Sequence, residues 1–106
     1  MIDSIWTNSE KKLARKVFDA AVERALSQLV EEFKRKAAAT SDVESLWKVR
    51  DWMNRRQREI DNEFDFRYSQ LILVFAKLVR ARKLEMAELN GLSEQKLAEI
   101  QFIAER

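Results

Sequence analysis

The sequence predicts an all-α protein, and three observations lead to this prediction. The 106 residues include one glycine and no proline, which leaves too few turn formers for a β architecture. Apolar residues recur at steps of three and four along most of the chain, the period of a helix with one buried face. Capping-box patterns at Thr7–Glu10 and Ser41–Glu44 indicate the starts of two helices. The length fits a single domain, residues 1–106.

The first helix is expected from Thr7 to about Ala39. Its roughly 30 residues should extend about 45 Å, whereas a compact globule of this chain length is roughly 34 Å across. The helix should therefore overhang the rest of the chain and leave an apolar stripe in solvent. A second copy is the simplest cover for such a stripe, so we expect a homodimer. The predicted dimer contacts are Leu26, Leu29, Val30, Phe33 and Leu46.

A second helix is expected from Val43 to about Asn62. Asp65 is expected to cap a third helix at roughly residues 66–83, although one continuous helix through this point is also compatible with the pattern. The third helix is apolar on nearly all sides from Leu71 to Val79, which indicates a central place in its subdomain.

Two short helices should complete a C-terminal head. The first spans Leu84–Leu89 and ends at Asn90–Gly91, and Ser93 caps the second. The expected architecture is therefore an elongated homodimer, in which residues 1–64 form long dimerising helices and residues 65–106 form a small helical head on each protomer.

Composition argues against several classes of function. The chain has no cysteine and no histidine, so thiolate nucleophiles, imidazole bases, disulfides and zinc sites built from these residues are excluded. Its longest apolar run, Leu71–Ala76, is far below the roughly 20 residues that span a bilayer. The N-terminus lacks the features of a signal peptide. We expect a cytoplasmic protein that is not an enzyme, needs no cofactor and does not enter a membrane.

The strongest acidic cluster is predicted to be an ordinary charged surface. Glu59, Asp61, Glu63 and Asp65 alternate along a helix, and residues two apart on a helix point to different sides. Arg55, Arg56 and Arg58 lie at the spacings that allow surface ion pairs with these carboxylates. We therefore predict neither a catalytic dyad nor a metal site here.

Trp47 and Trp52 interleave with the basic residues of the segment from Trp47 to Arg58, and this segment has three interpretations. It resembles a nucleic-acid surface, but Asp51 and the acidic run downstream would repel phosphate. It also fits a solvated helix face with half-buried tryptophans. A protein-docking site is favoured because Trp and Arg are enriched at interface hot spots, and Trp47 and Asp51 share a face framed by Arg50 and Arg58. By periodicity alone, Trp47 fits the core equally well.

At these residues the sequence resembles the fluorescence recovery protein family of cyanobacteria. The similarity is carried by Leu46-Trp47-Lys48, Asp51, Glu59-Ile60-Asp61, Asp65, Arg67 and Val74-Phe75-Ala76 with Leu78-Val79. Trp6, Phe18, Arg24, Leu26, Leu29 and the Leu89-x-Gly91-Leu92 ending also fall in register. The resemblance covers nearly the whole chain.

The resemblance implies a non-enzymatic helical homodimer that binds the light-activated orange carotenoid protein, mainly through that protein's C-terminal domain. Such a regulator accelerates the return of its partner from the red to the orange form and so ends photoprotective quenching. The resemblance places Trp47 and Asp51 in a functional patch and Val30 and Leu46 in the dimer interface.

Three positions depart from the family pattern. Gln57 stands where the family patch has an arginine, and Arg50 stands where it often has a histidine. Leu73 replaces a phenylalanine of the head for which the resemblance implies contact with the carotenoid protein. The chain is therefore expected to be a divergent member, and a helical adaptor for a different protein is the alternative function. Nucleic-acid binding is the less favoured one. The predicted partner-binding residues are Trp47, Arg50, Asp51, Gln57, Arg58 and Leu73.

Overall fold

The structure, a computed structural model, describes residues 5–106 and is all-α, as predicted. No strand occurs in this range, in which an isolated bridge joins Asn90 and Leu92. Its elements in chain order are α1 (Asn8–Ala38), α2 (Val43–Glu63), α3 (Leu71–Arg80), the short 3-10 helix η1 (Met86–Leu89) and α4 (Glu94–Ala104).

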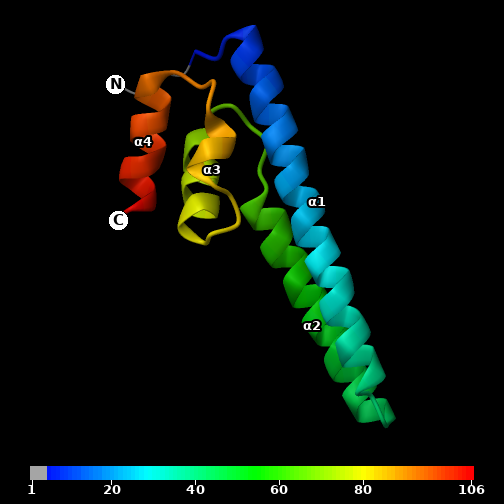
Figure 1. Cartoon of the computed structure of the whole chain (residues 1–106). Coiled ribbons are helices and arrows are strands. Elements are labelled where there is room, and N and C mark those ends of the chain that lie inside the picture. Colours follow the sequence, from blue (N-terminus) through cyan, green and yellow to red (C-terminus); the bar gives the residue numbers. More distant parts are fainter. Residues whose placement is uncertain (1–4) are drawn as a thin grey trace.

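The molecule is elongated because the two long helices form a hairpin that extends beyond the head. In Figure 1, α1 and α2 run side by side to a distant tip, while α3, η1 and α4 gather beside the N-terminal half of α1. The overall dimensions are 54 × 23 × 20 Å. The expected overhang of the first helix is therefore present. No helix within residues 5–106 combines the length and the apolar character needed to cross a bilayer.

Local hydrogen bonds explain where the long helices begin. The predicted capping box of α1 is confirmed, because the Thr7 hydroxyl accepts from the Glu10 amide at 3.1 Å and the Glu10 carboxylate accepts from the Thr7 amide at 3.0 Å. The cap of α2 is Asp42 and not Ser41 as predicted, and its carboxylate accepts from the Ser45 amide at 2.8 Å. A charged carboxylate is the stronger acceptor for an amide at this position.

The third helix is shorter than predicted, and Asp65 does not cap it. α3 begins at Leu71, and Asp65 instead forms an ion pair with Arg67 in the connecting segment. Phe64 and Phe66 in this segment pack on Phe18 of α1, with ring centroids 5.7 and 4.9 Å away. These aromatic contacts anchor residues 64–70 as a non-helical link that ends in a turn at residues 68–70, and they outweigh the local helical pattern.

The C-terminal end of α3 also differs from the prediction. The helix ends at Arg80, and the Lys83 amide donates to the Leu78 carbonyl at 2.9 Å across a turn in which Arg82 has φ of 61°. This is the Schellman arrangement that closes a helix. The predicted short helix at Leu84–Leu89 is a single 3-10 turn, Met86–Leu89. Ser93 caps α4 as predicted, since its hydroxyl accepts from the Lys96 amide at 3.2 Å.

The hydrophobic core is confined to the head and the first half of α1. α3 contributes the largest share, and its Leu71, Phe75 and Leu78 are at most 2% exposed. On α1 the buried residues are Glu10, Ala14, Val17, Phe18 and Ala21. No residue of α1 from Val22 to Ala38 is buried, and α2 buries a single residue, Ile60. The outer half of the hairpin therefore has almost no core of its own.

Candidate protein-binding surfaces

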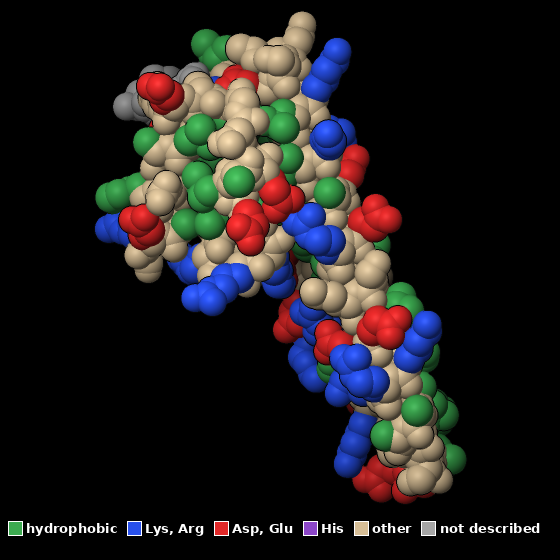
Figure 2. Space-filling model, in the orientation of Figure 1, with side chains coloured by type: hydrophobic (Ala, Val, Ile, Leu, Met, Phe, Trp, Pro, Cys, Tyr) green, Lys and Arg blue, Asp and Glu red, His purple; other side chains and the backbone are tan. Residues whose placement is uncertain are grey.

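The apolar residues predicted to form a dimer interface lie exposed on the hairpin. Leu26, Val30 and Phe33 are 46%, 49% and 41% exposed, and Leu46 on α2 is 48% exposed. Leu29 differs from these residues, because its side chain is half-buried against α2 and not exposed. In an α-helix, Leu26, Val30 and Phe33 are three or four residues apart and so share one face. In Figure 2, hydrophobic side chains reach the surface along the hairpin as well as over the head.

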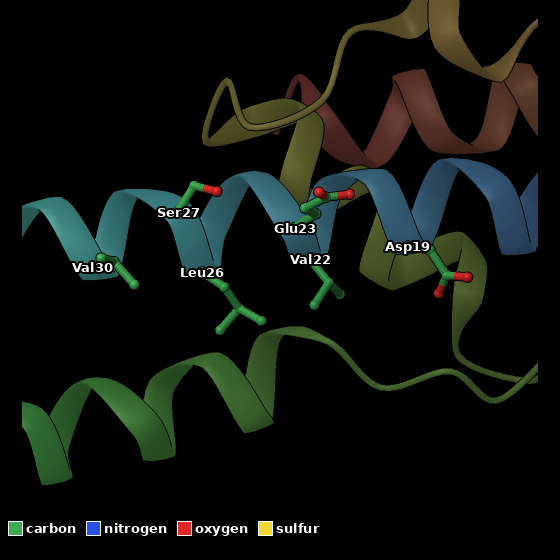
Figure 3. Close-up of a pocket in the computed structure, with 6 residues that line it drawn as sticks. All are labelled: Asp19, Val22, Glu23, Leu26, Ser27 and Val30. Carbon is green, nitrogen blue, oxygen red and sulfur yellow. The ribbon is translucent and has the colours of Figure 1, made fainter.

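A shallow groove of about 410 Å³ follows the same stripe of α1. Figure 3 shows Val22, Leu26 and Val30 projecting from one side of the helix, with the Asp19 and Glu23 carboxylates at the end nearer the head. Val22 extends the predicted stripe by one helical turn toward the head. Apolar side chains bordered by carboxylates form a surface that is suited to binding another protein.

The second surface is a cluster of Trp47, Arg50 and Asp51 on α2. The Arg50 guanidinium lies 4.9 Å from the centre of the Trp47 ring and donates to the Asp51 carboxylate at 3.0 and 3.2 Å. Trp47 is 48% exposed, so it belongs to the surface and not to the core. One guanidinium thus connects an aromatic face and a carboxylate. This arrangement offers apolar area and charge together, a combination typical of hot spots.

The remaining predicted binding residues are distributed along the molecule. Gln57 is seven residues after Arg50, two turns along the same face of α2, and lines a groove of about 370 Å³ with Leu26 and Leu29. Arg58 is exposed on the next face of α2. Leu73 is 39% exposed on α3 in the head, whereas Trp47 follows the hairpin tip. Within one protomer, the structure does not bring Leu73 together with Trp47.

The acidic cluster near the end of α2 forms separate ion pairs. Arg56 pairs with Glu59 at 2.7 Å as predicted, but Glu63 pairs with Lys83 at 2.5 Å and Asp65 with Arg67. The hydrogen bond from Arg56 keeps the pKa of Glu59 below its ordinary value, and the one from Arg67 does the same for the pKa of Asp65. Within residues 5–106 no group of acidic side chains could hold a metal ion.

The sequence interpretation missed a buried ion pair between Glu10 and Lys96. Lys96 is 1% exposed, and its ammonium lies 3.3 Å from the Glu10 carboxylate and 5.1 Å from the centre of the Trp6 ring. A signal for this burial exists in the sequence, because Lys96 falls in one helical row with Leu92 and Ile100. The pair joins the start of α1 to α4 and so positions the head.

The fold and these two surfaces together define the class of protein. It is an elongated all-helical protein whose distinctive features are exposed surfaces suited to binding other proteins. Comparison with known proteins specifies the class further. The model of the family described as photoprotection regulator fluorescence recovery protein matches residues 6–104. The chain belongs to the fluorescence recovery protein family. Its role is therefore that of a photoprotection regulator, and the family is not a known enzyme family.

Individual relatives agree with this assignment. The fluorescence recovery protein of Synechocystis sp. is 30% identical over 99 residues, which are 93% of this chain and 91% of that protein. The solved structure of the Fremyella diplosiphon protein superposes with a TM-score of 0.91 at 30% identity and covers 96% of this chain and all of its own. The Synechocystis structure gives the same TM-score at 29% identity, with the same coverage of both chains.

Proposed function

We propose that this chain works as a homodimer that binds the photoactivated orange carotenoid protein and accelerates its return from the red to the orange form. In this proposal the dimer is cytoplasmic and docks on the partner's C-terminal domain. The coarser role, regulation of photoprotection, follows from membership of the family.

The main observation in favour of a dimer is that the outer half of the hairpin has almost no hydrophobic core of its own. α1 buries nothing between Val22 and Ala38, and α2 buries only Ile60. A long helix pair in water is stabilised mainly by the burial of an apolar face, not by helix propensity. A second copy laid on Leu26, Val30, Phe33 and Leu46, with Leu29 beneath them, would supply that burial. An interface formed by the same patch on both copies has two-fold symmetry.

The partner-binding surface in this proposal is centred on Trp47, Arg50 and Asp51. Their mutual contacts hold a half-exposed ring, a guanidinium and a carboxylate in one place. Gln57 and Arg58 would extend the surface along α2, and Leu73 would add a separate contact from the head. In a dimer, the head of one copy and α2 of the other can both face one partner. Leu73 of one copy and Trp47 of the other could then contact the same partner, although the two residues lie far apart within one protomer.

The test is to mix the purified chain with photoconverted orange carotenoid protein and to follow the red-to-orange recovery in the dark. We expect faster recovery, and a loss of about thirtyfold or more in apparent affinity for Trp47→Ala, since hot-spot truncations cost at least 2 kcal/mol. Phe102→Ala is the matched control, because Phe102 is an exposed aromatic on α4 outside the proposed surface. Absence of both acceleration and co-elution would contradict this proposal.

A second candidate is a regulator that recognises a different protein with the same scaffold. Arg50, Gln57 and Leu73 favour it, because each departs from the family pattern at a position of the predicted binding set. Co-elution without any change in the recovery rate would indicate this alternative.

A further inference from the structure

A cavity of about 180 Å³ lies where the head meets the two long helices. Its cationic wall consists of Arg24 from α1, Arg56 from α2, and Arg82 and Lys83 from the turn after α3. The Gln28 amide and the methyl groups of Ala21 and Ala25 complete the lining, and no carboxylate belongs to it. Figure 2 shows lysine and arginine side chains gathered near this junction of head and hairpin.

Carboxylates outside the lining hold three of the four cations in place. Arg24 donates to Glu88 at 3.2 Å and to the Lys83 carbonyl at 2.9 Å. Arg56 pairs with Glu59 at 2.7 Å, and Lys83 pairs with Glu63 at 2.5 Å. The hydrogen bond that Arg56 donates to the Glu59 carboxylate raises the pKa of Arg56, so that guanidinium is fixed as a cation. These contacts orient the donors in advance and so reduce the entropy lost when a ligand is bound.

Arg82 is different because it makes no ion pair with any residue in the described part of the chain. Its φ of 61° places it in the left-handed region, at the position after a helix where glycine is usual. An arginine there strains the backbone, and none of the carboxylates within residues 5–106 pairs with its guanidinium. Its charge is the unneutralised one in the cavity wall.

We propose that this cavity binds a phosphate-sized oxyanion. Guanidinium, ammonium and amide donors approach from three elements, which suits a multivalent tetrahedral anion better than a single planar carboxylate. The cavity volume of about 180 Å³ leaves room for such an anion with a few waters. Bound there, the anion would connect α1, α2 and the head.

The site lies apart from the proposed dimer interface. Arg24 and Leu26 are two residues apart on α1, so their side chains point about 200° away from each other around the helix axis. Gln28 shares the face of Arg24, and Val30 shares the face of Leu26. The cavity therefore stays accessible when the stripe is covered, and the proposal does not depend on the carotenoid protein.

The test is a titration of the intact chain with inorganic phosphate at constant ionic strength, with chloride as the balancing anion. Side-chain NMR signals of the arginine Nε–Hε groups report binding. We expect saturable shifts for Arg24, Arg56 and Arg82, and a melting temperature that rises with phosphate beyond its value in chloride. A parallel titration with glycerol phosphate separates a free anion from an esterified phosphate, according to which ligand binds more tightly.

Two variants of Arg82 and one control make the test specific. Arg82→Gln and Arg82→Gly should each weaken phosphate binding about tenfold or more, since each removes a charge-assisted contact. Arg82→Gly should melt in chloride at or above the temperature of the unmodified chain, because glycine relieves the strained φ. Arg35→Gln removes the same charge from an exposed site near the hairpin tip and should leave binding unchanged. No saturable shift, or equal weakening by Arg82→Gln and Arg35→Gln, would overturn the proposal.

Discussion

Glu10 and Lys96 lie 86 residues apart in the sequence and form an ion pair across the head, with 3.3 Å between the ammonium nitrogen and the nearer carboxylate oxygen. Both residues are buried, at 5% and 1% exposure. The same carboxylate accepts from the amides of Thr7 at 3.0 Å and Ser93 at 2.8 Å. Lys96 also donates to the Ile5 carbonyl at 2.6 Å. One acidic side chain thus caps the start of α1 and holds the chain where α4 begins.

Replacement of this carboxylate should therefore cost far more stability than a typical surface change. Glu10→Gln keeps the shape but removes the charge that faces Lys96 in a buried site, so we expect a loss of about 2 to 4 kcal/mol in the free energy of unfolding. Urea denaturation at a fixed protein concentration measures it. Glu31→Gln is the control, because Glu31 is exposed and pairs loosely with Lys34 at 3.7 Å. That change should cost less than about 0.5 kcal/mol, and a similar loss in both variants would contradict the assignment.

The same carboxylate should make stability depend on acidic pH. Burial raises the pKa of Glu10, but hydrogen bonds from Thr7, Ser93 and Lys96 outweigh it, so the pKa in the fold lies below the ordinary 4.5. A lowered pKa means that the folded chain binds fewer protons than the unfolded chain. The contribution is fully present above about pH 4.5 and is lost as the pH falls through the folded pKa. Thermal unfolding between neutral pH and pH 3 should show this loss.

The comparison with Glu10→Gln isolates that contribution. The variant should show a shallower decline below about pH 4.5, because one of the groups with a lowered pKa is gone. A decline remains from Glu59 and Asp65, whose pKa values are also lowered by hydrogen bonds from arginine. Parallel pH profiles for the two proteins would show that Glu10 does not contribute to the acid sensitivity.

Local signals in the sequence predicted the helical elements well where no distant contact competes. The box at Thr7–Glu10 and the cap at Ser93 follow from side chains within three residues of the amides they bind. The non-helical link at residues 64–70 did not follow, because it depends on Phe64 and Phe66 packing against Phe18 more than 40 residues away. Tertiary contacts of this kind override local pattern.

The candidate surfaces were also predictable only where they depend on local sequence pattern and not on distant contacts. The stripe of Leu26, Val30 and Phe33 follows from helical period, and its exposure follows from the length of the helix. The cavity around Arg82 was not predictable, because its wall comes from three elements whose packing no single segment encodes. A charged residue on a helix is usually solvated, so the sequence analysis assigned no structural role to Lys96, although its place in the row of Leu92 and Ile100 is a signal for burial.

Charges placed on the apolar stripe should separate the proposed dimer. Val30→Glu or Leu46→Glu would bring a carboxylate into an apolar contact and cost several kcal/mol of association free energy. Light scattering should then report a protomer mass where the unmodified chain gives twice that mass. Ala98→Glu, at an exposed position of α4, introduces the same charge outside the stripe and should leave the mass unchanged. A dimer that persists in both stripe variants would exclude this interface.

An arginine at position 57, the residue that the resemblance to the family implies there, should strengthen the proposed carotenoid-protein activity. Gln57 lies two turns after Arg50 on α2 and beside Asp61, which can pair with an arginine at i,i+4 spacing and hold it in place. A guanidinium there adds a charge-assisted contact to a partner carboxylate, so Gln57→Arg should lower the chain concentration needed for half-maximal recovery rate about tenfold. Gln95→Arg adds the same charge at an exposed site of α4 and should have no such effect. Equal recovery rates for Gln57→Arg and the unmodified chain would mean that Gln57 is not what distinguishes this protein from its relatives.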